Sequence, residues 1–426
     1  MKIKYFLPDW EDRLDPNFDF EADQLSRPRE EAFENDQYAH EFLNSPPYDG
    51  ILISLAVYQN KVNLQQGEDG KPSIRGYKSV RRYLRLTGRN KSLEVMGDCG
   101  AFAFVNEEKP PKIFNTKRVA DLYHQLKFDY GVSVDHMVPD FIYQFNRDNE
   151  REKVFLTEQD KESRIRLSLK NAEEFILYHK KNDYNFVPIA AIQGTDPQSY
   201  ANSVDNCLEM GYRYLGLGTL IPKSNPEVVR ILEAVNEVLN KLDGLKKKDI
   251  KIHLFGITRA ELLRDFRRLG VTSIDSASYL RKAWLRSGQN YLLKKGKWFA
   301  AIRVPYASNP GLIKNAKKEG LTKKDLRVQE AHCLKLLRKY EGRKVGVNKV
   351  LDTILSYDEL LLRGWDENNH RDKYREMLKY RPWEKCKCEI CRAIGIDVVI
   401  FRGCNRNKRR GLHNMKVFYD HILNKN

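Results

Sequence analysis

Two side chains with reactive chemistry stand next to each other between glycines in the segment MGDCGAF, residues 96–102. Asp98 directly follows an apolar run, where a carboxylate is costly unless it is hydrogen-bonded, paired or used in chemistry. Cys99 would act as a nucleophile only with a nearby base and a lowered pKa, and no cysteine-enzyme signature surrounds it. The pattern favours Asp98 as the chemical group and Cys99 as a small buried thiol.

Three further cysteines stand close together in the segment CKCEIC, at Cys386, Cys388 and Cys391. Thiolates at this spacing repel one another unless a cation neutralises them, and tetrahedral Zn²⁺ does so with a fourth nitrogen or sulfur ligand. Cys404 and His413 are both candidates for that ligand, and the spacing does not choose between them. With four protein ligands the metal would be structural and would not take part in the reaction.

The chain is strongly basic, with a formal net charge of +17. Such an excess indicates a polyanionic partner such as nucleic acid. We expect a nucleic-acid docking surface beside the metal loop, formed by Arg406, Lys408, Arg409 and Arg410. The stretch 306–385 is also basic, helical in pattern and tyrosine-bearing, which suits phosphates and exposed bases, although a solvated helical face gives the same pattern.

Short apolar, β-branched runs recur along the chain and are nearly continuous rather than alternating, as in strands buried on both faces of a parallel sheet. They cover residues 50–58, 93–96, 130–134, 186–192, 214–220, 250–255 and 271–274. Helix signals lie between them, so the alternation favours an α/β fold of the (β/α)₈ TIM-barrel type over an open doubly wound sheet. For the eighth strand we expect residues 394–401, with 299–304 as the alternative.

A barrel of this type carries its chemistry at the carboxyl ends of its strands. Polar or small residues follow the apolar runs there, namely Asp98, Asp135, Gln193, Gly218 with Thr219, Gly256 and Asp275. A turn at the end of a strand also selects such residues, so each is a weak signal alone. Together they form a candidate site with three carboxylates and an amide.

These residues resemble, in order, the motifs of the tRNA-guanine transglycosylase family, which exchanges guanine in a polynucleotide for a 7-deazaguanine on a zinc-containing (β/α)₈ barrel. The resemblance covers residues 50–305 and 386–420. The matching segments are GDCGAF, SVDHMVPD, IQGT, GLGTL, HLFGITRAELLRDFRRLGVTSIDSAS and the CKCEIC pattern followed by His-Asn.

The resemblance implies a role for each residue of the candidate site. Asp275 would be the nucleophile that forms a covalent glycosyl-aspartate, and Asp98 the general acid and base. The purine-like base would be bound by Asp135, Gln193 and the backbone at Gly218 and Thr219. Among the metal candidates, the family pattern implies Zn²⁺ held by Cys386, Cys388, Cys391 and His413, and not by Cys404.

The polynucleotide is implied by a finer resemblance. The chain has GAFA at 100–103, where the tRNA enzymes usually have Gly-Gly-Phe-Gln, and SASY at 276–279, where they have Cys-Val-x-Pro. The lead-in and the tail FRGCNRNKRRGLHN instead resemble the branch that inserts 7-deazaguanines into DNA, with 7-cyano-7-deazaguanine (preQ0) as the incoming base. The sequence leaves open whether a helper ATPase of the same modification system takes part.

Three alternatives fit parts of the pattern. The same exchange on tRNA, in the queuosine or archaeosine pathway, uses the same catalytic residues. A hydrolytic glycosylase would release guanine without an incoming base. A non-catalytic, zinc-containing nucleic-acid-binding protein would have no use for paired carboxylates near phosphates, so Asp98 and Asp275 argue against it.

The expected organisation is a lead-in (1–48), a transglycosylase barrel (49–305), a basic helical insertion (306–385) and a small zinc-binding subdomain with C-terminal barrel elements (386–426). No stretch approaches the roughly 18 to 20 apolar residues of a membrane helix. The basic start contains Pro8 and acidic residues where a signal peptide is apolar. We therefore expect a cytoplasmic protein with no membrane partner.

Overall fold

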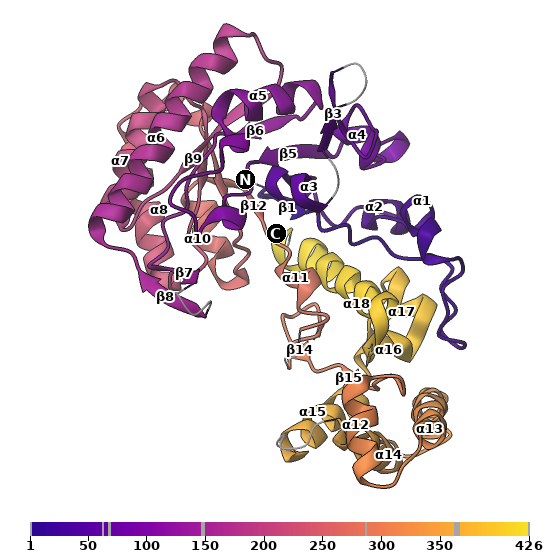
Figure 1. The fold of residues 1–426 in the computed structure, drawn as a ribbon. Coiled ribbons are helices and arrows are strands. Elements are labelled where there is room, and N and C mark those ends of the chain that lie inside the picture. Colours follow the sequence, from indigo (N-terminus) through magenta and orange to yellow (C-terminus); the bar gives the residue numbers. More distant parts are fainter. Residues whose placement is uncertain are drawn as a thin grey trace. The chain divides into compact units, whose positions relative to one another are not determined.

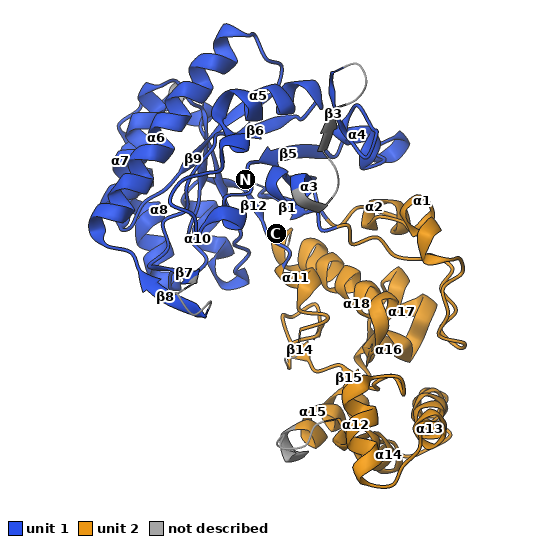
Figure 2. Ribbon diagram, viewed as in Figure 1, with its two compact units in different colours: residues 1–10, 48–277 blue, residues 11–47, 278–426 orange. Residues whose placement is uncertain are grey.

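The structure, a computed structural model, describes residues 2–61, 64–66, 70–145, 150–285, 288–361 and 367–424. The chain forms two compact units, each assembled from two separate parts of the sequence (Figure 2). The first unit contains residues 1–10 and 48–277, and the second contains residues 11–47 and 278–426. The lead-in is thus divided between the units, and the barrel unit ends at residue 277 and not at 305.

The first unit is a closed barrel of parallel strands, which confirms the predicted (β/α)₈ fold (Figure 1). In barrel order the strands are β1 (Lys4–Pro8), β12 (Val271–Asp275), β11 (Lys251–Leu254), β10 (Tyr214–Leu217), β9 (Val187–Ile192), β6 (Tyr130–Val132), β5 (Glu94–Asp98) and β2 (Gly50–Ser54). All seven apolar runs identified in the sequence overlap a barrel strand.

The eighth strand is β1 at the start of the chain, so both predicted positions for it are wrong. β1 pairs in parallel with β12 and β2. The two predicted segments lie in the second unit and pair with each other, as β15 (Ile302–Arg303) and β16 (Ile400–Phe401). The short run KYFLP in β1 has charged residues close on both sides, which hid its buried side chains from a search for long apolar runs.

Helices follow the strands and lie around the barrel (Figure 1). They are α3 (Leu55–Lys61), α4 (Val80–Tyr83), α5 (Thr116–Gln125), α6 (Glu158–Lys181), α7 (Pro197–Glu209), α8 (Asn225–Asn240), α9 (Gly244–Asp249) and α10 (Leu263–Arg268). Two hairpins are inserted, β3 (Leu64–Gln66) with β4 (Pro72–Ile74) and β7 (Phe141–Phe145) with β8 (Arg151–Phe155). Short 3₁₀ turns are η2 (Gly88–Asn90), η3 (Ala101–Phe104), η4 (Lys112–Phe114) and η5 (Ala260–Leu262).

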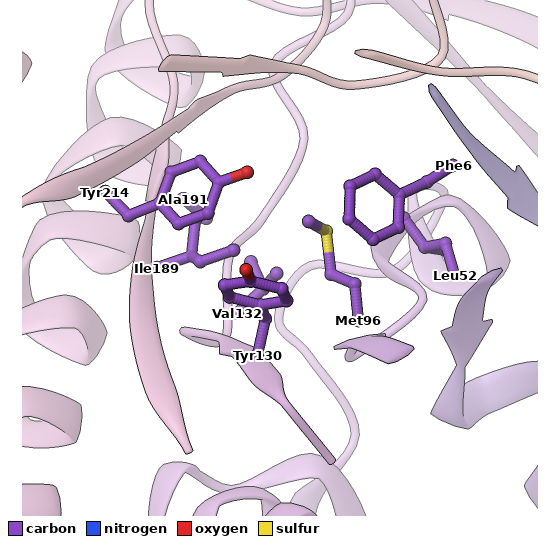
Figure 3. Close-up of a cluster of buried hydrophobic side chains, with 8 residues drawn as sticks. All are labelled: Phe6, Leu52, Met96, Tyr130, Val132, Ile189, Ala191 and Tyr214. Atoms are coloured by element: carbon purple, nitrogen blue, oxygen red, sulfur yellow. The ribbon is translucent and has the colours of Figure 1, made fainter. Parts of the chain in front are cut away.

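Buried side chains from six strands fill the barrel interior (Figure 3). They are Phe6, Leu52, Met96, Tyr130, Val132, Ile189, Ala191 and Tyr214. The ring of Tyr130 packs edge-on against Phe6 and Tyr214, with centroid distances of 6.2 and 5.5 Å. Side chains alternate across a strand, so the inward set that contains Met96 continues to Asp98 at the end of β5.

The second unit is mainly helical. Its helices are α1 (Ala32–Asn35), α2 (Ala39–Phe42), α11 (Ser278–Arg281), α12 (Pro310–Lys318), α13 (Lys323–Glu341), α14 (Val347–Glu359), α15 (Glu367–Tyr380), α16 (Pro382–Lys385), α17 (Glu389–Ile394) and α18 (Gly403–Phe418). Its short elements are β13 (Tyr291–Leu292), β14 (Trp298–Phe299), η1 (Arg29–Glu31), η6 (Gly395–Val399) and η7 (Tyr419–Leu423). The stretch 306–385 is helical, as expected, but shares one compact unit with the metal loop. Within the described ranges, no helix has the length and apolar character to cross a bilayer.

Two strand glycines make room for the ring of Tyr123 on α5. A Cβ atom on Gly131 would lie 2.5 Å from Tyr123 Cδ2 and 2.7 Å from Phe186 Cε2, and a Cβ atom on Gly97 would lie 2.4 Å from Tyr123 Cε1. Both rings are buried, so neither can move into solvent to make room for a methyl group. Close packing of α5 on the barrel therefore depends on these glycines.

We predict that Gly131→Ala lowers the free energy of unfolding by about 1 to 3 kcal/mol, because it overpacks a filled core. The matched control is Gly244→Ala on α9, where an added Cβ atom meets nothing within 4 Å, and we expect no loss of stability there. Urea unfolding of both variants measures the difference. Equal stability of the two variants would contradict the packing argument.

Candidate active site

The barrel brings the six residues with an expected role in catalysis or base binding to the carboxyl ends of its strands. Asp98 and Asp275 are the last residues of β5 and β12, and Gln193 directly follows β9. Asp135, Gly218 and Thr219 lie just beyond β6 and β10. The expectation that these residues share one rim of the barrel is therefore met.

Asp275 is held through only one of its two carboxylate oxygens. Oδ1 accepts hydrogen bonds from the Gly256 backbone N–H at 2.9 Å and from His253 Nε2 at 3.1 Å. Among the described residues, Oδ2 has no hydrogen-bond partner. The side chain is buried, so its orientation is fixed while one oxygen stays available to react.

His253 is a functional candidate that the sequence analysis missed. It is fully buried on β11, and its Nδ1 lies 2.8 Å from Ser273 Oγ, which in turn lies 2.6 Å from the Tyr214 hydroxyl. If Nε2 donates to Asp275, Nδ1 must accept from Ser273, and Tyr214 then donates to Ser273. A chain of hydrogen bonds inside the barrel therefore orients the carboxylate. A polar residue at an inward position of the apolar run IKIHLF was the available signal.

Gly256 is required by the backbone geometry of the same site. Its φ of +72° lies in the left-handed region, and an added Cβ atom would lie 2.6 Å from Ile221 Cδ1. A residue with a side chain is strained at this φ, so glycine is the residue that can present its N–H to Asp275 here.

Asp98 lies in a different environment. Its Oδ1 atom is buried and has no hydrogen-bond partner in the described part of the chain. Burial raises the pKa of Asp98 to about 7, and the negative charges of Asp275 and Asp135 add to this effect, while a hydrogen bond from Ser54 opposes it. Near neutral pH, Asp98 can therefore both donate and accept a proton.

Asp135, Gln193 and Thr219 form one hydrogen-bonded row. Gln193 Nε2 donates to Asp135 Oδ2 at 2.6 Å, and Thr219 Oγ1 donates to Gln193 Oε1 at 2.7 Å. Burial raises the pKa of Asp135, whereas its hydrogen bonds from Gln193 and Cys99 lower it. The row presents carboxylate, amide and hydroxyl groups, which can bind the donors and acceptors along one edge of a heterocyclic base.

The turn after β10 is fixed by close contacts. The Tyr200 hydroxyl donates to the Gly218 carbonyl at 2.7 Å. A Cβ atom on Gly218 would lie 2.4 Å from Gln193 Nε2, so glycine is needed for the amide to lie against the backbone. Thr219 has a φ of +53°, unusual for a residue with a side chain, which places its hydroxyl against Gln193.

Cys99 is a buried packing thiol and a weak hydrogen-bond donor. Its Sγ lies 3.3 Å from Asp135 Oδ1. Burial raises the pKa of this thiol well above its usual range, and the charges of Asp135 and Asp98 add to the effect. A thiol held in its protonated form is a poor nucleophile, so this geometry supports Asp98 as the reactive member of the pair.

Four residues of the second unit form a cluster that could hold a metal ion. The ligand atoms of Cys386, Cys388, Cys391 and His413 all lie within 4.8 Å of one another. His413 Nδ1 lies 3.4, 3.4 and 3.7 Å from the sulfurs of Cys388, Cys391 and Cys386. A tetrahedral zinc ion with ordinary bond lengths places its nitrogen and sulfur ligands about 3.6 Å apart, so the donor set and its spacing fit such an ion.

Neighbouring groups orient the metal ligands, as is usual in structural metal sites. His413 Nε2 lies 2.8 Å from the Leu292 carbonyl, and the Tyr291 ring stacks on the imidazole with a centroid distance of 4.1 Å. The ligands come from α17, α18 and the loop after α16, and these helices lie side by side (Figure 1). Cys404 is exposed and stands outside the cluster.

The four basic residues expected to bind nucleic acid are placed differently from that expectation. Arg406, Arg409 and Arg410 are buried. Arg406 donates to the carboxylates of Asp23 and Asp397, and Arg406 and Arg409 donate to backbone carbonyls of the lead-in. Lys408 donates to the Arg13 carbonyl, and Arg410 donates to backbone carbonyls outside the lead-in. The irregular lead-in has carbonyl groups that need donors, and α18 supplies them. Arg406, Lys408 and Arg409 thus attach the lead-in to α18, whereas Arg410 binds carbonyls of Ala283, Val398 and Ile400. The three arginines therefore do not form an exposed surface.

We predict that Asp98 makes stability fall as pH rises. The folded chain retains this proton up to a pKa of about 7, whereas an unfolded aspartate loses it near 3.9. The contribution of Asp98 to the free energy of unfolding is complete below about pH 4. It is lost as pH rises through about 7, and the loss amounts to at most about 4 kcal/mol. In urea unfolding, the free energy of unfolding of Asp98→Asn should therefore increase relative to that of the wild type as pH is raised from 4 to 8. Asp205→Asn, at an exposed position of α7, controls for the loss of a carboxylate, and parallel curves for the wild type and Asp98→Asn would contradict the assignment.

Comparison with known proteins tests the family resemblance. No family model matches the chain. A DNA-guanine transglycosylase from Salmonella montevideo is 34% identical over 423 residues, which cover 99% of this chain and 97% of that protein. The similarity extends over both units and contains the barrel site and the metal cluster. The chain therefore belongs to the DNA-guanine transglycosylase family, the DNA-modifying branch of the tRNA-guanine transglycosylases.

Proposed function

We propose that the chain exchanges guanine in DNA for a 7-deazaguanine base, with Asp275 as the nucleophile and Asp98 as the general acid and base. The observation that carries the proposal is the pair of carboxylates, Asp98 and Asp275, in contrasting environments at one end of the barrel. The name of the full-length relative supports guanine in DNA as the substrate. The incoming base, 7-cyano-7-deazaguanine, rests on the resemblance of the motifs.

The first step removes guanine. Oδ2 of Asp275 attacks C1′ of the target deoxyguanosine, and the electron pair of the C1′–N9 bond leaves with the base. Asp98, protonated below a pKa of about 7, gives its proton to the departing guanine. The product is a covalent glycosyl-aspartate, as in retaining glycosidases, where one carboxylate attacks and the other transfers the proton.

The second step installs the new base. Asp98, now a carboxylate, accepts the proton from N9 of the incoming 7-deazaguanine. N9 attacks C1′, the bond from C1′ to Oδ2 of Asp275 breaks, and both carboxyl groups return to their starting states. The proton balance closes within the site, which is why one acid must ionise near neutral pH and the other must be ionised at the start.

Asp135, Gln193 and the turn at Gly218 and Thr219 would read the edge that both bases share. A guanine-like edge offers N–H donors beside a carbonyl acceptor, and the row offers carboxylate and amide partners for these groups. The bonds from Gln193 to Asp135 and from Thr219 to Gln193 keep the row ordered before a base arrives. A target base inside a duplex must first leave the base stack, at a cost of a few kcal/mol.

The metal cluster would hold Zn²⁺ through Cys386, Cys388, Cys391 and His413. Bound zinc would supply a structural cross-link and no Lewis-acid chemistry, because four protein ligands leave no open position. His413 is fixed for this role by the Leu292 carbonyl and by the Tyr291 ring.

The test of the function is incorporation of labelled 7-cyano-7-deazaguanine by the purified chain, offered duplex DNA and tRNA in parallel, with and without a helper ATPase. We expect label in DNA alone. Asp275→Asn should abolish incorporation, and Asp98→Asn should lower it by about 10²- to 10⁴-fold, the usual contribution of general acid–base catalysis. Asp205→Asn should retain the wild-type rate.

The other outcomes each contradict a part of the proposal. Label in tRNA alone would overturn the choice of DNA while keeping the roles of Asp98 and Asp275. Guanine released from DNA without incorporation would indicate a hydrolytic glycosylase. No reaction on either nucleic acid, with the ATPase present, would favour a non-catalytic binding protein.

We predict that the purified chain contains one zinc ion per molecule and that Cys388→Ser loses it and lowers the melting temperature. The reason is that the ion replaces thiolate repulsion in the second unit with four ligand bonds. Cys404→Ser is the matched control, because that thiol is exposed and outside the cluster. Elemental analysis and thermal unfolding check both variants, and zinc loss in Cys404→Ser with retention in Cys388→Ser would reverse the ligand assignment.

A further inference from the structure

The second unit contains a groove between helix α13 and the lead-in. Its volume is about 770 Å³, and its walls are α13 on one side and residues 21–23 on the other. The two walls are connected, because Arg338 of α13 donates to the Phe20 carbonyl at 2.6 Å and contacts Asp397. The groove is therefore built into one compact unit.

Most acidic groups in the groove are already neutralised by internal partners. Asp23 pairs with Arg402 and Arg406. Glu330 pairs with Arg402 and accepts a hydrogen bond from the Ala307 N–H at 2.9 Å. Glu21 is the groove carboxylate without such a cation among the described residues, and it is exposed.

The basic groups of α13 along the groove are not neutralised in this way. Arg327, Lys335 and Lys339 line the groove and are exposed, and Lys344 extends the row beyond the end of the helix. None of these four has an acidic or hydrogen-bonding side-chain partner in the described ranges. Four cations against one free carboxylate give the groove a net positive charge.

The spacing of these residues places the charges in a line. Positions 327, 331, 335 and 339 share one face of a helix, because residues four apart are neighbours on its surface. With 1.5 Å of rise per residue, Arg327 and Lys339 are about 18 Å apart along the axis. Such a row is long enough to contact more than one phosphate of a nucleic-acid backbone. Ala331, in the middle of the line, leaves room for a backbone to approach.

We propose that this groove binds the sugar-phosphate backbone of the DNA substrate. The inference rests on the proposed function for the choice of DNA. It assigns to α13 the backbone contacts that the buried residues Arg406, Arg409 and Arg410 cannot make. Lys and Arg contacts to phosphates position a duplex without reading its sequence, so binding in the groove is expected to be independent of sequence and strongly dependent on salt.

The test is binding of the full-length chain to a short fluorescent DNA duplex, measured by anisotropy over a series of salt concentrations. The triple variant Arg327→Gln, Lys335→Gln, Lys339→Gln should bind at least about 10-fold more weakly. It should also reduce the slope of log K against log salt by about 0.9 for each phosphate that the groove no longer neutralises. Glu21→Gln should change affinity in the opposite direction, because it removes the groove's free negative charge.

A matched control removes the same charge elsewhere. Lys117, Lys170 and Lys181 are exposed on α5 and α6 of the barrel, and replacing all three with Gln should leave affinity and salt slope close to those of the wild type. An equal loss of affinity in both triple variants would mean that only net charge matters and would overturn the groove. Unchanged binding in the groove triple, or a groove-dependent preference for an RNA duplex over DNA, would also overturn it.

Base exchange measured on the same variants separates this inference from the proposed function. The groove triple should raise KM for DNA and leave kcat unchanged, the signature of weakened ground-state binding. Groove-dependent DNA binding without any exchange would contradict the proposed reaction and leave the groove supported. Base exchange by the wild type, together with unchanged DNA binding in the groove triple, would support the proposed reaction and contradict the role of the groove.

Discussion

The two hydrogen bonds that Oδ1 of Asp275 accepts are the interaction on which the proposed chemistry of the site depends. A carboxylate taken out of water loses several kcal/mol of solvation, and hydrogen bonds from the Gly256 N–H and His253 compensate for that loss at 2.9 and 3.1 Å. Because both bonds go to the same oxygen, the carboxylate is oriented without being fully occupied. A nucleophile needs this combination of a fixed position and a free lone pair.

The barrel supplies this geometry through strand pairing. His253 and Asp275 lie on the neighbouring strands β11 and β12, and the register between these strands shifts at Ile252 and His253. His253 and Asp275 both lie on the inward side, so the imidazole spans from Ser273 to the carboxylate within the interior. Asp98, on β5, has its Oδ1 unpartnered among the described residues and its pKa raised to about 7. One fold thereby places two chemically identical side chains in different hydrogen-bonding environments.

Much of this architecture could be predicted from the sequence, for identifiable reasons. Runs such as FVPIAAI and YLGLGTL are continuously apolar because both faces of a parallel strand are buried, and the polar residues that follow them marked the rim of the barrel. β1 was missed because its apolar stretch is short and flanked by charges. His253 was missed because an isolated histidine in an apolar run gives no sign of its partner. The burial of Arg406 and Arg409 could not be foreseen, since most of their acceptors lie in the distant lead-in, nearly 400 residues away for Asp23 and Asp15. Arg410 instead donates to the carbonyls of Ala283, Val398 and Ile400, which only the folded chain brings around its side chain.

The central claim is that Asp275 becomes covalently bonded to the sugar during the reaction. The most direct measurement is to quench the wild-type chain with substrate DNA in acid, digest both polymers and locate the sugar adduct by mass spectrometry. We predict a deoxyribosyl group on the peptide that contains Asp275. An adduct on Asp98 or on another residue, or base exchange with no protein-bound sugar at any reaction time, would contradict the claim.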